Sequence, residues 1–268
     1  MHYVEVGAGQ PVVFLHGNPT SSYLWRAVLD QADLGPRRAV AVDLIGMGRS
    51  GKPPIDYTLA DHAEHVAALL DALALDDMVL VGHDWGVAIA LDYLRRHPSR
   101  VTAVAFMEGH LRPLPDWSGI DRVFRDIRTP GVGERMVLEE NFFVDTLLPA
   151  ATRRPLSPTD LAAYRRPYPT PQSRRPLLQW ARQIPIAGEP QGAAAIMDRS
   201  WAAFTASRVP KLLLHGGSGV VLTADKIAMC RAALPALTVA DLGDAGHFLP
   251  EDRPTELAAA LSTWLTTI

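Results

Sequence analysis

The sequence has 268 residues, of which 48% are hydrophobic and 21% are charged, and its formal net charge is -3. This composition is typical of a globular protein with one sizeable core, and it argues against disorder. The small negative charge offers no attraction to nucleic acid or to an anionic membrane, so we expect a small-molecule partner instead. The sequence shows neither a secretory leader nor an apolar stretch of membrane-spanning length, which predicts a cytoplasmic protein.

Short apolar runs alternate with helical patterns in the first half of the chain. Buried parallel strands are predicted at residues 12–15, 39–42, 78–81 and 101–107. Apolar residues recur every three or four positions over residues 59–73 and 87–96, which predicts helices with one face on a sheet. Repeated units of this kind predict an α/β fold with a mostly parallel, doubly wound sheet. Functional residues of such a fold lie at the carboxyl ends of the strands.

The alternation stops after residue 107 and resumes near residue 211. The segment 112–190 is rich in proline and arginine and contains helix-length pieces at 133–143 and 177–181, which predicts an inserted helical cap. The core domain is then discontinuous, formed by residues 1–111 and 191–268. Its second part is predicted to contain strands at 211–215 and 237–242, and helices near 223–233 and at 254–265.

The segment from Val81 to Gly86 follows a predicted strand and begins a predicted helix. Gly82 and Gly86 stand two positions on either side of Asp84, the spacing that a sharp strand-to-helix turn requires. This pattern predicts a nucleophile elbow with aspartate as the nucleophile. The alternative is a chance turn in which Asp84 only caps the helix.

An elbow nucleophile needs a histidine after the last strand and an acid that orients it. His247 lies in a glycine-containing loop directly after the strand at 237–242. Glu108 follows the strand at 101–107, whereas the loop at 216–219 contains no carboxylate. Asp225 stands at the start of a predicted helix, where an acid is favoured by the helix dipole. We therefore expect His247 as the base and Glu108 as its partner.

Aspartate at the elbow changes the chemistry. With a reference pKa of about 3.9 it is ionised at neutral pH and needs no base to become a nucleophile. Asp84 can displace a leaving group from a saturated carbon and form an alkyl ester. His247 can then remove a proton from the water that attacks this ester. Neither a metal ion nor an organic cofactor is expected.

The chain resembles the haloalkane dehalogenases, in particular the branch with an Asp-His-Glu triad. The similarity runs nearly end to end and includes the segments 16–26, 43–50, 107–108, 141–143 and 184–190 besides the elbow. It implies an α/β-hydrolase fold and the hydrolysis of small apolar haloalkanes to a primary alcohol and a halide ion. It also implies that the side chains of Asn18 and Trp85 bind the halide. We expect the protein to be a monomer or a weak homo-oligomer.

Further roles follow from the same resemblance. The backbone N–H groups of Trp85 and of a residue near Asn18 are expected to stabilise the oxyanion, and His83 and His16 to be structural. The predicted walls of the substrate pocket are Phe143, Tyr168, Pro176, Val220, Val221 and Phe248.

The sequence departs from this family at three places. Tyr168 replaces an expected phenylalanine, and His110 an expected apolar residue, so both are expected to affect substrate preference. The N-terminal residues match the second strand of the family, which predicts that the usual edge strand is absent and the sheet edge exposed.

Three alternatives share the scaffold. An epoxide hydrolase would use Tyr164 and Tyr168 as donors to the epoxide oxygen, but that family carries an aromatic residue in place of Asn18. A cofactor-free, luciferase-like oxygenase can have the same catalytic and halide-binding residues, namely Asp84, His247, Glu108, Asn18 and Trp85. A catalytically inactive ligand-binding receptor is disfavoured because nucleophile, acid and base are all present.

Overall fold

The computed structural model describes residues 1–118, 122–217 and 219–268. In this part of the chain, seven strands form one sheet with the order β1-β3-β2-β4-β5-β6-β7. The strands are β1 (Tyr3–Gly7), β2 (Gln10–Leu15), β3 (Arg37–Val42), β4 (Met78–His83), β5 (Val101–Met107), β6 (Lys211–His215) and β7 (Leu237–Asp241). Strand β1 pairs with β3 antiparallel and the other pairs are parallel, which confirms the predicted mostly parallel sheet.

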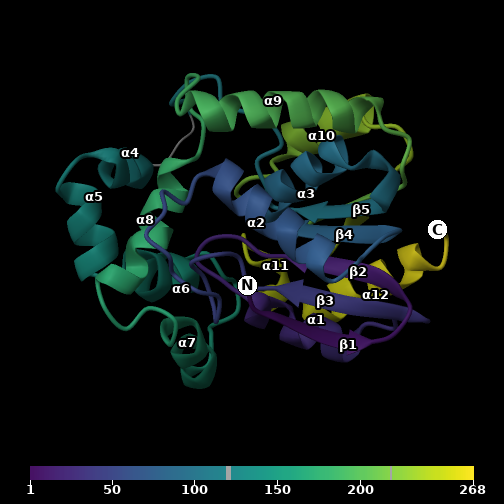
Figure 1. The fold of residues 1–268 in the computed structure, drawn as a ribbon, viewed down its shortest axis with the longest axis horizontal. Coiled ribbons are helices and arrows are strands. Elements are labelled where there is room, and N and C mark those ends of the chain that lie inside the picture. The colour runs from purple at the N-terminus through teal and green to yellow at the C-terminus, as the bar shows by residue number, and fades with distance from the viewer. Residues whose placement is uncertain (119–121, 218) are drawn as a thin grey trace.

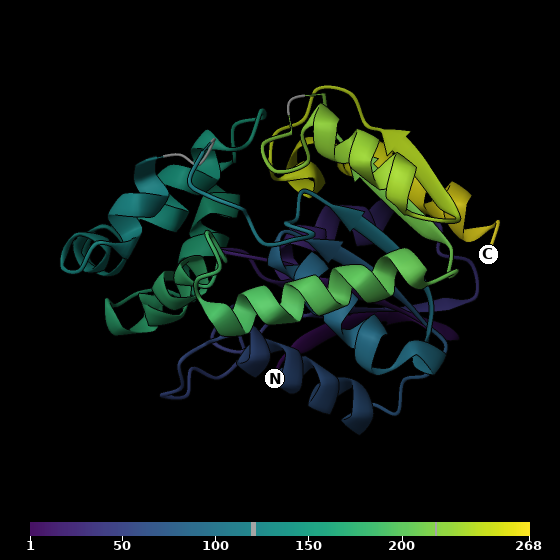
Figure 2. The same cartoon turned by 90° about the horizontal axis from the view of Figure 1, so that it is seen from above.

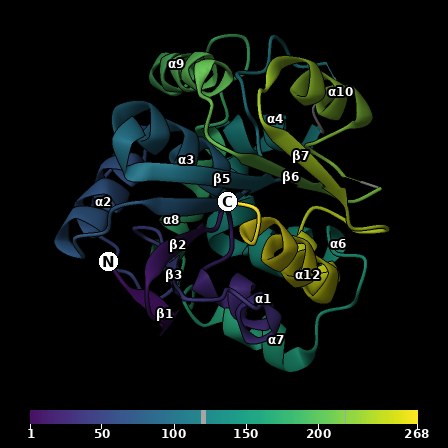
Figure 3. The same cartoon turned by 90° about the vertical axis from the view of Figure 1, so that its right-hand side faces the viewer.

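Helices cover both faces of the sheet. Helices α1 and α12 pack together on one face, and α2, α3 and α9 on the other (Figure 3). Every residue of β4 is buried, as a strand covered on both faces requires. The helical elements of the core are η1 (Ser22–Trp25), α1 (Arg26–Gln31), α2 (Leu59–Ala72), α3 (Trp85–Arg96), η2 (Pro98–Arg100), α10 (Ala224–Ala233), α11 (Leu249–Asp252) and α12 (Pro254–Leu265).

A helical segment is inserted between β5 and β6. Helices α4 to α8 gather at one end of the sheet, and α9 runs back along it (Figures 1 and 2). The helical elements between β5 and β6 are α4 (Arg122–Arg128), α5 (Val132–Glu134), η3 (Arg135–Glu139), η4 (Phe143–Leu147), α6 (Leu148–Ala150), α7 (Pro158–Arg165), η5 (Gln172–Arg174), α8 (Arg175–Arg182) and α9 (Gln191–Ala206). Helix α9 packs against α3 of the core, so its contacts agree with a boundary near residue 190, which stays a prediction.

The prediction of one helix over residues 133–143 is wrong in its C-terminal part. Helix α5 continues as a π-helical turn, η3, which ends at Glu139, and a second π-helical turn begins at Phe143. Between them, Asn141 has a positive φ of 53°, which no α-helix contains. Periodicity alone does not show such a break. Within the described residues, no helix is long and apolar enough to span a membrane.

Strand β1 forms one edge of the sheet. Its Val4 and Val6 side chains are 40% and 53% exposed. On the same strand, Glu5 forms an ion pair with Arg38 of β3. Within the described residues, β1 therefore has a neighbouring strand on one side only.

Candidate active site

Strand β4 passes into helix α3 through Asp84, whose φ and ψ are 52° and -122°. A side chain at Gly86 could not be accommodated, since its Cβ would lie 2.0 Å from the carbonyl oxygen of Leu15. A Cβ at Gly82 would lie 2.9 Å from the carbonyl carbon of Gly86. The predicted sharp turn is thus confirmed. Asp84 occupies the N-cap position, but within the described structure its side chain makes no capping hydrogen bond.

The two carboxylate oxygens of Asp84 have different neighbours. Oδ1 accepts a hydrogen bond of 2.9 Å from the backbone N–H of Asn18, and the backbone N–H of Trp85 also donates to the carboxylate. Oδ2 lies 3.7 Å from Nε2 of His247. Burial raises the pKa of Asp84, although the charge of His247 and the two N–H groups oppose this. The carboxylate is therefore poorly solvated, and its Oδ2 faces the imidazole of His247.

His247 lies between Asp84 and Glu108. Its Nδ1 is 3.2 Å from Oε2 of Glu108. Burial alone would lower the pKa of His247, but its hydrogen bond to Glu108 and the charge of Asp84 raise it. A carboxylate on Nδ1 favours the tautomer that leaves Nε2 free to accept a proton on the side of Asp84.

Glu108 is fully buried, and backbone N–H groups hold its carboxylate. Val220 and Val221 donate to Oε2 at 3.0 Å, and Leu222 donates to Oε1 at 3.1 Å. Burial acts to raise the pKa of Glu108, but the hydrogen bond and charge of His247, together with backbone N–H groups, lower it to about 2. Gly219 is required beside it, since a Cβ there would lie 2.5 Å from Oε1.

Two further histidines brace the loops around the site. His83 Nε2 lies 2.8 Å from the carbonyl oxygen of His247, and burial lowers the pKa of His83 to about 3. The neutral ring therefore donates to that carbonyl. His16 accepts from the backbone N–H of Leu44 through Nε2 and donates to the Gly17 carbonyl through Nδ1. Both arrangements agree with the structural roles predicted for them.

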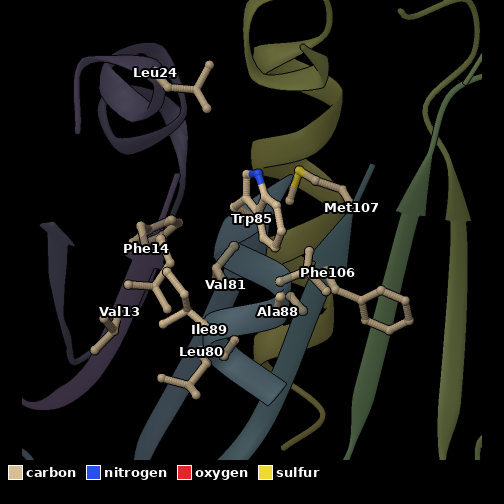
Figure 4. Packing of buried hydrophobic residues seen from close by; sticks show 14 of the residues in the cluster. Val13, Phe14, Leu24, Leu80, Val81, Trp85, Ala88, Ile89, Phe106 and Met107 are labelled. Carbon is tan, nitrogen blue, oxygen red and sulfur yellow. The ribbon is translucent and has the colours of Figure 1, made fainter. Parts of the chain in front are cut away.

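The predicted halide-binding residues lie beside Asp84. The Asn18 side chain is 8% exposed, and its Nδ2 donates to the Leu177 carbonyl of α8 at 3.2 Å. Trp85 is 5% exposed, and its ring stacks on Trp180 of α8 with centroids 4.3 Å apart. Figure 4 shows Trp85 at the start of α3, close to Met107 at the carboxyl end of β5. The structure thus brings both residues to the edge of the sheet where Asp84 lies.

The predicted pocket residues divide by their surroundings. Phe248 is fully buried, with its ring centroid 4.7 Å from that of His247. Phe143 and Val221 are also buried. Val220 is 65% exposed, which does not suit the wall of a buried pocket, and its observed link to the site is its backbone N–H.

Two other predicted pocket residues contact the loop after β3. Tyr168 is buried beneath Lys52, whose Nζ lies 5.2 Å from the ring centroid. Pro176 packs against Gly46, where an added Cβ would lie 2.9 Å from the proline ring. Their place in the substrate pocket stays a prediction.

His110 lies two residues after Glu108, in the wall of a cavity of about 260 Å³ that Leu222 and Lys226 also line. Burial, with the charges of Lys226 and His247, lowers the pKa of His110 to about 3. It is therefore a neutral polar group beside the site. Among the described residues, no group of three or more histidines, cysteines or acids is placed to hold a metal ion.

Sequence reasoning missed the contacts that hold these side chains. Gly219 is a weak signal for the backbone at 220–222 that presents its N–H groups to Glu108. Nothing in the sequence signals that Trp180 and Leu177 contact Trp85 and Asn18, because these pairs come from separate segments of the chain.

A mostly parallel sheet with an aspartate at a strand-to-helix turn and a histidine after the last strand defines an α/β hydrolase. The family model described as the alpha/beta hydrolase fold matches residues 10–254. A haloalkane dehalogenase of Mesorhizobium japonicum is 43% identical over 273 residues, which cover 99% of this chain and 87% of the relative. One of Agrobacterium fabrum is 41% identical over 272 residues, covering 100% of this chain and 89% of the relative.

Solved structures agree with these relatives. A haloalkane dehalogenase from Bradyrhizobium elkani superposes with a TM-score of 0.96 at 41% identity, covering 99% of this chain and 93% of that one. An ancestral haloalkane dehalogenase gives a TM-score of 0.96 at 40% identity, covering 99% of this chain and 95% of that one. The chain belongs to the haloalkane dehalogenases, hydrolases that act on carbon–halide bonds.

Proposed function

We propose that this haloalkane dehalogenase acts in two steps through a covalent ester on Asp84. The observation that carries this proposal is the series of contacts from Asp84 Oδ2 through His247 to Glu108, 3.7 and 3.2 Å long. The backbone N–H of Asn18 holds the other oxygen, Oδ1, and the backbone N–H of Trp85 also donates to this carboxylate. The chemistry needs one free nucleophilic oxygen, one oriented base and one prepared oxyanion site.

In the first step, Oδ2 of Asp84 attacks the carbon that carries the halogen. The new C–O bond forms as the carbon–halogen bond breaks, and the halide leaves with the bonding electrons. The Asn18 amide and the Trp85 indole N–H donate to the departing halide. Donors that are in place before the charge develops lower the barrier, and one such donor accounts for about 10²- to 10³-fold in rate.

In the second step, His247 takes a proton from water, and the resulting hydroxide attacks the ester carbonyl carbon. The N–H groups of Asn18 and Trp85 stabilise the oxyanion at Oδ1. The intermediate collapses, the alkoxide takes the proton from His247, and a primary alcohol is released. Asp84 then returns a proton to the solvent, so that water and haloalkane yield alcohol, halide and one proton.

We propose small apolar haloalkanes as substrates and a monomer or weak homo-oligomer as the functional form. Buried Phe143, Val221 and Phe248 support an apolar pocket beside the triad. An epoxide hydrolase would use Tyr164 and Tyr168 as donors, and the first of these is engaged: the Tyr164 hydroxyl donates to the carboxylate of Glu251, and burial raises the pKa of this tyrosine. A donor engaged in this way is not free to bind an epoxide oxygen.

The proposal is tested by measuring halide release from short bromo- and chloroalkanes. The wild-type protein should release halide, Asp84→Ala should not, and His247→Phe should accumulate an alkyl ester that intact-protein mass spectrometry locates on Asp84. A folded wild-type protein that releases no halide from any of these substrates would contradict the proposal. Epoxides, and oxidation of a luciferin-type substrate, would then be tested on the same variants.

A further inference from the structure

Three flat rings from different helices lie in a row, and His62, Trp180 and Trp85 are called the aromatic stack below. The ring centroids of His62 and Trp180 are 3.8 Å apart, with an angle of 26° between the planes. Those of Trp180 and Trp85 are 4.3 Å apart at 19°. All three residues are at most 5% exposed. Trp180 of the inserted α8 is therefore held between the core helix α2 and the residue that follows Asp84.

The same helix also contacts the other proposed halide donor. The Leu177 carbonyl accepts a hydrogen bond from the Asn18 amide. Leu177 and Trp180 are three positions apart, so they lie on the same side of α8. One helix of the insertion thus contacts Asn18 through its backbone and Trp85 through a ring.

His62 is a buried polar ring that the proposed mechanism does not use. Both of its ring nitrogens are buried, and neither has a hydrogen-bond partner in the described part of the chain. Burial, together with the charges of nearby histidines, keeps its pKa well below 6.5, so the ring is uncharged. Unpaired buried nitrogens cost free energy that an apolar ring would not. The His62 ring provides a flat surface that stacks on the Trp180 ring, on the side away from Trp85.

We propose that Trp180, supported by His62, is a positioning residue that fixes the Trp85 indole in the orientation that binds halide. Helix α8 thereby aligns both halide donors with Asp84. This inference rests on the proposed halide-binding role of Trp85 and Asn18. The physical reason is that a donor contributes fully only when it is held in place before charge develops, and a displacement of about 1 Å can cost on the order of 10²-fold in rate.

The test compares Trp180→Leu and Trp180→Phe with the control Trp264→Leu. Trp264 is a tryptophan of similar burial, 4% exposed, on helix α12 at the other face of the sheet. Its replacement removes the same buried volume without touching the stack. Three quantities are measured: the bromide inhibition constant, the rate constant of ester formation and the rate constant of ester hydrolysis.

Trp180→Leu should weaken bromide inhibition and slow ester formation, each by about 10-fold or more, while ester hydrolysis changes little because it uses backbone N–H groups. Trp180→Phe keeps a flat ring and should recover most of the loss. Trp264→Leu should lose stability but keep all three constants. This pattern separates positioning from general destabilisation.

Variants of His62 extend the test in case Trp180→Leu does not fold. His62→Phe should keep the wild-type bromide constant, and His62→Ala should weaken bromide inhibition in the same direction as Trp180→Leu. If folded Trp180→Leu and His62→Ala bind bromide and form the ester as the wild type does, the inference is wrong although the proposed function stands. If the wild type releases no halide, the proposed function itself fails, and this inference fails with it.

Discussion

Glu108 and His247 fix each other's protonation state. Burial acts against the charge on each residue, yet their mutual hydrogen bond lowers the pKa of Glu108 to about 2 and raises that of His247. The ionised Glu108, together with the charge of Asp84, therefore makes the buried imidazole more basic. Three backbone N–H groups complete the environment of its carboxylate.

Replacing Glu108 by Gln keeps the shape of the side chain and removes its charge. We expect ester hydrolysis to slow by about 100-fold or more, because His247 loses the partner that stabilises its imidazolium form. Ester formation should change little, since Asp84 needs no base. Rapid-quench measurements of ester and alcohol will separate the two steps. Asp225→Asn, which alters a first-turn acid of α10, is the control and should behave as wild type.

The pH dependence of ester hydrolysis follows from the protonation of His247. Only the neutral imidazole accepts a proton from water, so the rate should rise with pH as His247 loses its proton; in the ester this pKa is still raised by the hydrogen bond to Glu108 but no longer by the charge of Asp84. The pKa of His83 is lowered to about 3, so it does not titrate in this range. In Glu108→Gln the rising limb should move to lower pH. A rate of ester hydrolysis that does not change between about pH 5 and 8 would show that His247 is not the base.

At the scale of elements, the turn between β4 and α3 depends on close backbone contact. Gly86→Ala places a Cβ 2.0 Å from the Leu15 carbonyl oxygen, so β2 and α3 must move apart. We expect a loss of about 3 kcal/mol or more in the free energy of unfolding, or no soluble protein. The control is Gly192→Ala in α9, where a Cβ would have no atom within 4 Å. This change should raise the free energy of unfolding by at most about 1 kcal/mol. Urea unfolding of both variants tests this, and equal effects would refute it.

Strands and helices with a clear pattern of apolar residues were predicted well. Those whose conformation depends on contacts with distant parts of the chain were not. The limits of β5, β6 and α12 agree with the sequence, because a buried strand or an apolar helix face leaves a plain pattern. Helix α9 was not predicted, since its buried side mixes alanine, serine, methionine and phenylalanine. The turns η3 and η4 depend on how the insertion packs, which no local pattern records.

The same division holds for the site. Asp84, Glu108 and His247 stand in motifs whose spacing predicted that they would meet, and they do. The ring of Trp180 and the carbonyl of Leu177 carry no such motif. Their contacts with Trp85 and Asn18 join parts of the chain that only the complete fold brings together.

At the scale of the whole molecule, the edge strand β1 is the surface most suited to self-association. In the described part of the chain it pairs with β3 alone, and it carries two exposed valines. Edge strands of this kind pair with other chains unless charge prevents it. We expect the wild type to associate weakly at high concentration and Val6→Lys to remain monomeric with unchanged turnover. The control is Ile268→Lys, which changes an exposed aliphatic side chain that lies outside β1. Sedimentation velocity over a concentration series measures the association. If the wild type, Val6→Lys and Ile268→Lys associate equally, β1 is not the surface of self-association.

The place of the insertion between β5 and β6 has a consequence for synthesis on the ribosome. His83 and His247 touch although they lie 164 residues apart, so the nucleophile is translated long before the base. Strands β1 to β5 are neighbours in the sheet and can pair before β6 exists. A nascent or truncated chain of this kind holds Asp84 without His247. The halide donors meet helix α8, and Asp84 meets His247, only when the later parts of the chain have been made, so a chain that stops early holds the nucleophile without a complete active site.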